Sequence, residues 1–166
     1  MAKKVSDVSD LVSLGIEAPA QVFPAIKTLA ASQDWQEREV AATALVEVSK
    51  KKPDEVVAEM LIWSGAPDPN IRRTASEGLR EVARRNPAHV LPVLENLKKD
   101  SALYVRKSVA NVLRNAGRKH PGFVLQTCSM WAAQGNVNTN WIVKDALRKL
   151  KDTQPKEVEQ IINSLH

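Results

Sequence analysis

The chain has 166 residues, of which 43% are apolar and 26% are charged, a composition that is ordinary for a soluble globular protein. No apolar run approaches the ~18 residues that a membrane span requires, and no apolar stretch follows the N-terminal lysines. We therefore expect a single domain over residues 1–166 that is cytoplasmic, has no signal peptide and has no membrane partner. The only cysteine, Cys128, cannot form an internal disulfide.

The positive charge is concentrated in the middle of the chain. The net charge is +5, but residues 70–120 hold 12 Lys and Arg against 4 Asp and Glu. A concentrated positive charge favours a polyanionic partner. A solvated basic face without a partner explains the same charge equally well.

Five prolines stand 34 residues apart, at Pro19, Pro53, Pro87, Pro121 and Pro155. Each is followed three residues later by valine and ten residues later by leucine or tryptophan. A period of this length held along the chain is typical of a repeat solenoid, in which each unit packs only on its neighbours.

The apolar spacing predicts helices only, in an all-α, right-handed solenoid of about four to five two-helix repeats. Proline suits the first turn of a helix, where a missing N–H costs nothing. Asp34, Asp68, Ser101 and Asn138 are expected N-caps of the second helix of each repeat. In chain order the expected helices span 5–16, 19–32, 35–50, 53–65, 69–85, 87–99, 102–118, 121–134, 139–151 and 155–165.

Several conspicuous side chains fall in apolar columns of the repeat. Trp63 and Trp131 take the place that leucine has in the other first helices, and Cys128 also stands in an apolar column. We therefore expect core packing rather than chemistry from them. The three histidines are scattered, and no metal-ligand cluster or phosphate-binding loop is present, so no cofactor and no metal are expected.

The second helices present a polar face opposite their apolar one. Stacking them aligns Glu39, Arg73 and Lys107, and a three-residue shift in the last repeat adds Lys144 to the row. This spacing suits contact with a phosphate backbone. The predicted nucleic-acid-binding residues on this face are Arg73, Lys107, Asn111, Arg114, Lys144 and Arg148. Arg38, Arg72 and Arg106, which precede them, are expected to tie loops together instead.

Aromatic residues stand where second helices begin. Trp141 and Tyr104 could stack on a nucleic-acid base, and Trp35 has a similar place. They could equally act as hydrophobic staples at a helix start.

The second helices carry the wording of a known family. The unit with Asp-Pro-x-(Ile/Val)-Arg resembles a HEAT repeat. The strings Ile71–Leu79, Leu103–Asn111 and Asn140–Arg148 resemble the HEAT-like DNA alkylation repair family, the AlkC/AlkD-type DNA glycosylases, and are closer to the AlkC branch.

That resemblance implies that duplex DNA is held on a basic concave face. It also implies that alkylated purines such as 3-methyladenine are excised without a cofactor. Glu39 and Glu77 match acidic positions of the branch and are the candidate catalytic residues. Asn115 stands where the branch has an aspartate, and the chain is shorter than typical members. The sequence therefore leaves open whether base excision is retained.

Two other interpretations fit the same repeats. One is a non-enzymatic HEAT scaffold whose groove holds a protein partner. The other is an array with no native ligand.

Overall fold

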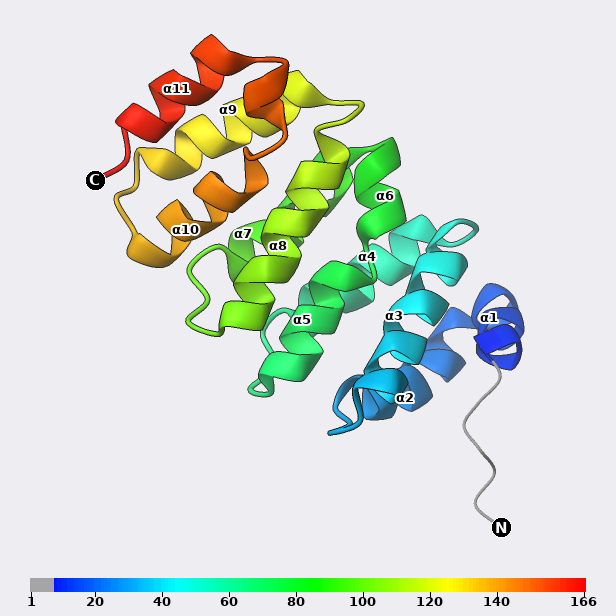
Figure 1. Ribbon diagram of the computed structural model, residues 1–166. Coiled ribbons are helices and arrows are strands. Elements are labelled where there is room, and N and C mark those ends of the chain that lie inside the picture. The colour runs from blue at the N-terminus through cyan, green and yellow to red at the C-terminus, as the bar shows by residue number, and fades with distance from the viewer. Residues whose placement is uncertain (1–7) are drawn as a thin grey trace.

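The computed structural model describes residues 8–166, and every regular element in that range is helical (Figure 1). Helix α1 (Val8–Glu17) opens the chain, and two layers of helices follow it. One layer holds α2 (Pro19–Ala30), α4 (Pro53–Trp63), α7 (Pro87–Leu97), α9 (Pro121–Ala132) and α11 (Pro155–Asn163). The other holds α3 (Trp35–Ser49), α5 (Pro69–Glu77), α6 (Arg80–Arg85), α8 (Leu103–Ala116) and α10 (Val137–Ala146). The predicted all-α solenoid is confirmed. None of the helices within 8–166 has the length and apolar content to cross a membrane.

The five prolines of the ladder each stand at the first residue of a helix, as the sequence predicts. These helices end about two residues before the expected positions. The opening helix also forms where it is expected, and its predicted start at residue 5 lies outside the described residues. The ladder therefore locates one layer of the solenoid.

The prediction of one continuous helix over 69–85 is wrong, because α5 ends before Gly78 and α6 begins at Arg80. A Cβ atom at Gly78 would lie 2.9 Å from both Cβ and Cδ1 of Leu45 on α3. Only glycine permits this close approach of the two chains. The last second helix is also interrupted, since a 3-10 turn at Leu150–Asp152 follows α10.

The helix caps show that the 34-residue period continues to the end of the chain. Asp34 and Asp68 cap α3 and α5 as predicted, each accepting a hydrogen bond from the backbone N–H two residues later. Ser101 and Asn138 are not the caps, because Ala102 and Asn136 occupy those positions. The four N-cap residues stand 34 residues apart, so the predicted three-residue shift in the last repeat is wrong.

The apolar columns form a continuous core from α2 to α11. Trp63 and Trp131 are buried, and their indole N–H groups donate to Glu59 and Glu95 at 2.9 and 2.8 Å. Cys128 is buried too, and burial raises the pKa of its thiol to about 12. The prediction that these residues pack the core is confirmed.

Arginines that open the second helices tie neighbouring repeats together. Arg72 forms two hydrogen bonds to the carboxylate of Asp100, at 2.8 and 3.2 Å, and two to backbone carbonyls. Arg106 donates to Asn138 of the next repeat. These contacts agree with the expected loop-tying role and hold the second helices in register.

Candidate nucleic-acid interface

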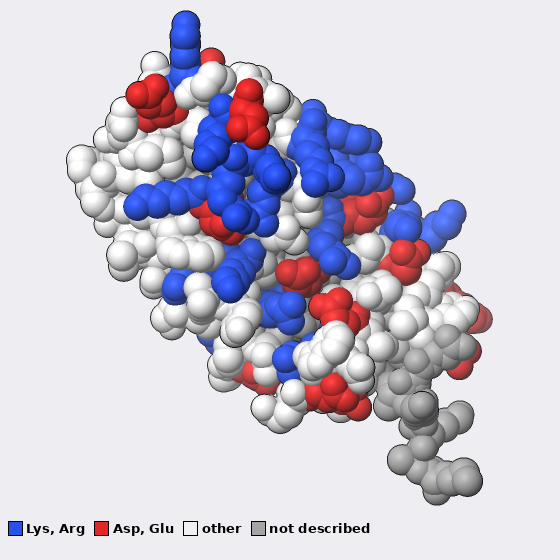
Figure 2. Space-filling view, in the orientation of Figure 1, with Lys and Arg blue, Asp and Glu red and all other residues white. Residues whose placement is uncertain are grey.

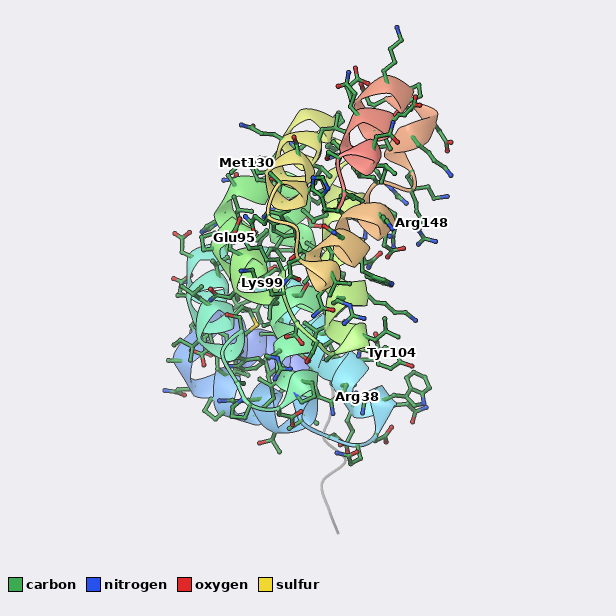
Figure 3. The ribbon with its side chains drawn as sticks, turned by 90° about the vertical axis from the view of Figure 1, so that its left-hand side faces the viewer. Arg38, Glu95, Lys99, Tyr104, Met130 and Arg148 are labelled. Atoms are coloured by element: carbon green, nitrogen blue, oxygen red, sulfur yellow. The ribbon has the colours of Figure 1, made fainter. Side chains whose placement is uncertain are left out.

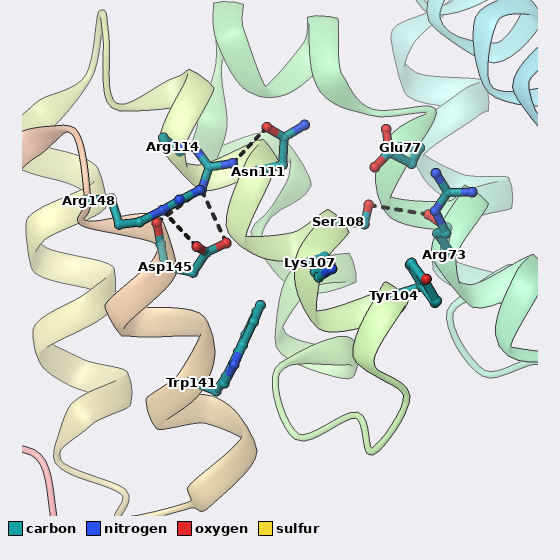
Figure 4. A pocket seen from close by; sticks show the side chains of 10 residues that line it. All are labelled: Arg73, Glu77, Tyr104, Lys107, Ser108, Asn111, Arg114, Trp141, Asp145 and Arg148. Atoms are coloured by element: carbon teal, nitrogen blue, oxygen red, sulfur yellow. Dashed lines mark hydrogen bonds and ion pairs between the residues drawn. The ribbon is translucent and has the colours of Figure 1, made fainter.

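The second helices α3, α5, α8 and α10 form one surface, here called the groove face, which is turned toward the viewer in Figure 1. In the side view of Figure 3, Tyr104 and Arg148 project from this face, whereas Glu95, Lys99 and Met130 lie away from it. A cavity of about 460 Å³ opens on the face between α5, α8 and α10. Its lining residues, drawn in Figure 4, are Arg73, Glu77, Tyr104, Lys107, Ser108, Asn111, Arg114, Trp141, Asp145 and Arg148.

The 34-residue period arranges this lining in three rows across the helices. The first row is Glu39, Arg73, Lys107 and Trp141. Arg73, Lys107 and Trp141 line the cavity, and Arg73 lies 3.7 Å from Glu39 at its edge. A pair at that distance between partly exposed side chains is worth at most about 1 kcal/mol, so Arg73 is available to another anion.

The second row is Glu77, Asn111 and Asp145, and the third is Arg80, Arg114 and Arg148. Within each helix the arginine contacts the second-row residue three positions earlier. The distances are 3.7 Å for Arg80–Glu77, 3.1 Å for Arg114–Asn111 and 2.8 Å for Arg148–Asp145. The repeat thus places an arginine beside a carboxylate or amide on each successive helix.

Asp145 has a second arginine from the neighbouring helix. Nη1 of Arg114 lies 3.2 Å from its carboxylate and 3.0 Å from its backbone carbonyl oxygen. The side chains of Arg114 and Asp145 are only 16% and 20% exposed, whereas that of Arg148 is 61% exposed. Arg114 therefore fixes the carboxylate, and Arg148 contacts it from the solvent side.

Two aromatic rings stand at the cavity, each next to a cation. Trp141 is half-buried and projects toward the cavity in Figure 4, with the guanidinium of Arg106 5.4 Å from its ring centre. Tyr104 is 67% exposed, and Nζ of Lys107 lies 5.3 Å from its ring centre. Both predicted stacking residues therefore present ring surface on the groove face.

The structure brings most of the predicted site residues together. Arg73, Lys107, Asn111, Arg114, Arg148, Trp141, Tyr104 and Glu77 all line the one cavity. Lys144 lies outside it, on an adjoining hollow that it shares with Trp141, Asp145 and Arg148. Glu39 does not line the cavity either, and it contacts the site only through Arg73.

Sequence reasoning missed Asp145, the carboxylate with the most partners in the cavity. The signal was present, because counting 34 residues from Glu77 gives Asn111 and then Asp145. The assumed three-residue shift concealed it and put Lys144 into a row that belongs to Trp141.

The basic middle segment converges only in part on the groove face. Figure 2 shows Lys and Arg side chains gathered over α5, α8 and α10, with acidic side chains among them. Four cations and two carboxylates line the cavity. Other cations of the segment are engaged elsewhere: Arg72 with Asp100, Lys98 with Glu95, and Arg84 and Arg85 with Glu81. The positive excess of the cavity is thus smaller than the sequence count suggests.

Within residues 8–166, no three His, Cys, Asp or Glu side chains are placed to hold a metal ion. The chemistry open to the cavity is that of its arginines, lysine, carboxylates and aromatic rings.

A family model of HEAT repeats matches residues 22–114, more than half of the chain. The chain belongs to the HEAT-repeat family. No curated protein sequence matches this HEAT-repeat chain.

Solved structures extend the likeness. The Pseudomonas fluorescens alkylpurine DNA glycosylase AlkC, bound to DNA containing an abasic site analog, is 28% identical with a TM-score of 0.61. That likeness covers 82% of this HEAT-repeat chain and 44% of AlkC, so the chain spans less than half of that protein's length. Similarity to the HEAT-like alkylation repair family, expected from the sequence, is confirmed.

Two Streptococcus mutans structures share the fold over a greater length. AlkD2 is 24% identical with a TM-score of 0.68, over 88% of this chain and 84% of that one. The protein smu.31 of strain UA159 is 24% identical with a TM-score of 0.67, over 88% and 86%. At this identity the two likenesses support the fold alone.

Proposed function

We propose that this HEAT-repeat protein binds duplex DNA on its groove face. The observation that supports this most strongly is the set of four cations, Arg73, Lys107, Arg114 and Arg148, that line one cavity from three successive helices. Cations repeated at the spacing of packed helices can follow a phosphate backbone. The likeness to a DNA-bound glycosylase supports the same ligand.

Charge reversal tests this proposal. Lys107→Glu should weaken binding to a short duplex by tenfold or more, measured by fluorescence anisotropy at low salt. Lys27→Glu makes the same change on α2, in the other helix layer, and should have little effect. Equal affinity of the two variants would contradict binding on the groove face.

Excision of an alkylated purine is the second part of the proposal. A purine alkylated at N3 carries a positive charge, so when its glycosidic bond to C1′ breaks, the bonding electrons leave with the base, which becomes neutral. The positive charge then develops on the sugar, where a nearby carboxylate stabilises it until water adds to C1′ and loses a proton. Asp145 and Glu77 are the two carboxylates that line the cavity, and Trp141 offers a ring beside Asp145.

The ion pairs of Asp145 decide how negative that carboxylate is. With both arginines in place its charge is largely offset. The exposed Arg148–Asp145 pair is worth about 0–1 kcal/mol, so a DNA phosphate can draw Arg148 away at little cost. Asp145, still oriented by Arg114, then regains negative charge in the presence of DNA.

Release of methylated purine from alkylated DNA tests excision. The wild-type protein should release base above the uncatalysed background, and Glu77→Gln should release less. Glu39→Gln, outside the cavity, is the matched control and should keep the wild-type rate. Release at background would leave a DNA-binding protein without glycosylase activity.

A protein partner is the second candidate, favoured by a different surface. Trp35, Leu103 and Val137 open second helices at 34-residue intervals and are 64%, 41% and 78% exposed. An exposed apolar row of this kind suits a protein contact. A partner captured from nuclease-treated lysate, and lost in the Trp35→Ser, Val137→Ser double variant, would favour a scaffold. Capture that disappears after nuclease treatment would favour DNA.

A further inference from the structure

A second cavity, of about 410 Å³, lies where α8 ends and the turn after α10 approaches it. Arg114, Gly117 and Arg118 line it from α8 and the residues just after that helix. Lys149 and Thr153 line it from the far side, and Pro121 marks the start of α9. None of these residues except Arg114 belongs to the groove cavity.

The charge of this second cavity is entirely positive. Three cations line it, and its lining includes no Asp or Glu. The side chains of Arg118 and Lys149 are exposed and have no hydrogen bond or ion pair with any residue in 8–166. Arg84 and Arg85, at the end of α6, show the alternative arrangement, because Glu81 binds both of them. The cations of the second cavity are therefore free for an external anion.

The second cavity is continuous with the groove through Arg114. The guanidinium of Arg114 is directed to Asp145 and Asn111 on the groove side, while its side chain forms a wall of the second cavity. A strand whose phosphate contacts Arg114 or Arg148 therefore has two unpaired cations next along its path. Thr153 and Gln154 add polar groups at the same place.

We propose that this second cavity is a phosphate-binding subsite that takes a phosphodiester of the DNA strand as the strand leaves the groove. This inference rests on the proposed function, because it assigns the path of the same ligand. Arg118 and Lys149 hold the phosphate, and Arg114 joins the subsite to the groove. A free phosphate shares this chemistry, so the test has one arm for each source.

A structural role for the same cations makes a different prediction. A cation near the end of a helix such as α8 is favoured by the helix dipole whether or not a ligand binds. In that case its removal lowers thermal stability and leaves ligand binding unchanged. The dependence of DNA affinity on salt is the readout that a purely structural role does not alter.

The first arm uses inorganic phosphate and the full-length protein, followed by NMR. Millimolar phosphate should shift the backbone amide signals of Gly117, Thr153 and Gln154 in the wild type. It should leave them in place in the Arg118→Gln, Lys149→Gln double variant. No shift in the wild type would overturn the subsite.

The second arm measures duplex affinity from 50 to 300 mM salt. The slope of log K against log [salt] should become shallower by about 1 to 2 in the double variant, as expected for one or two lost phosphate contacts. The control Lys50→Gln, Lys51→Gln removes the same charge at the equivalent end of α3 and should keep the wild-type slope. An equal loss of slope in both variants would overturn the assignment to the strand.

The two arms separate the two proposals. Phosphate shifts together with no duplex binding by the wild type would refute DNA binding and support a site for free phosphate. Duplex binding with an unchanged slope and no phosphate shifts would support the groove and refute the subsite.

Discussion

Arg114 holds Asp145 at two points, with Nη1 3.2 Å from the carboxylate and 3.0 Å from the backbone carbonyl oxygen of the same residue. The contact joins α8 to α10 and crosses 31 residues of sequence. It places a mostly buried carboxylate among the cations that are proposed to bind DNA. The consequences for binding and for excision have opposite signs.

Asp145→Asn should raise duplex affinity and lower excision. Removing a negative charge beside the phosphate path should strengthen binding by about fivefold, since two unit charges about 4 Å apart in water exchange ~1 kcal/mol. The same change removes the charge that stabilises the sugar cation, and excision should fall by about 10²–10³-fold. Anisotropy and base-release assays on one preparation give both values. A parallel fall in affinity and excision would indicate misfolding or a purely structural ion pair.

Glu81 should make the stability of the fold depend on pH in the acid range. Hydrogen bonds from Arg84 and Arg85 to Glu81, the first of them contributing most, lower its pKa from 4.5 to about 2. A lowered folded-state pKa adds stability that is fully present above about pH 4.5 and is lost as pH falls toward 2. Urea unfolding between pH 2 and 6 should therefore show a shallower acid loss in Glu81→Gln than in the wild type. The control Glu159→Gln, on exposed α11, should keep the wild-type curve.

Gly78 and Gly122 offer a matched pair for the packing of the repeats. Gly78→Ala forces a Cβ to within 2.9 Å of Leu45 and should destabilise the fold by about 1–3 kcal/mol. Gly122→Ala, in α9, meets nothing within 4 Å and should stabilise the fold by about 0.4–1 kcal/mol. Denaturant midpoints measure both. If Gly78→Ala is as stable as Gly122→Ala, the close approach of α5 to α3 is not tight.

Cys128 should be unreactive in the folded protein. Its thiol is buried and its pKa is raised to about 12, so at pH 8 almost none of it is thiolate and a reagent cannot reach it. Labelling with a chromogenic disulfide should proceed only as fast as the chain opens and should accelerate in urea. Rapid labelling without denaturant would show that α9 is not packed as described.

The period of the sequence predicts the layers of this fold, because proline and the apolar columns mark each first helix independently. It predicts the burial of Trp63 and Trp131 for the same reason. The break at Gly78 could not be predicted, since it depends on the contact with Leu45 on another repeat. A one-dimensional pattern carries no information on such approaches.

The candidate site was predictable in its cations and less so in its carboxylates. Arg73 and Lys107 follow from the polar face of each helix alone. Asp145 follows only when the last repeat is aligned without a shift, and Thr139, buried in the place of Val105, obscured that alignment. Choice of partner among nearby charges, as between Arg114 and Asp145, depends on how the helices pack.

The most direct test of the central claim is the salt dependence of duplex binding by the wild-type protein and by Lys107→Glu. With four groove cations on phosphates, the wild-type slope of log K against log [salt] should be about −3 or steeper. The slope of Lys107→Glu should be shallower by about 1 or more. A wild-type slope near zero, or the same slope in both proteins, would contradict the binding of DNA on the groove face.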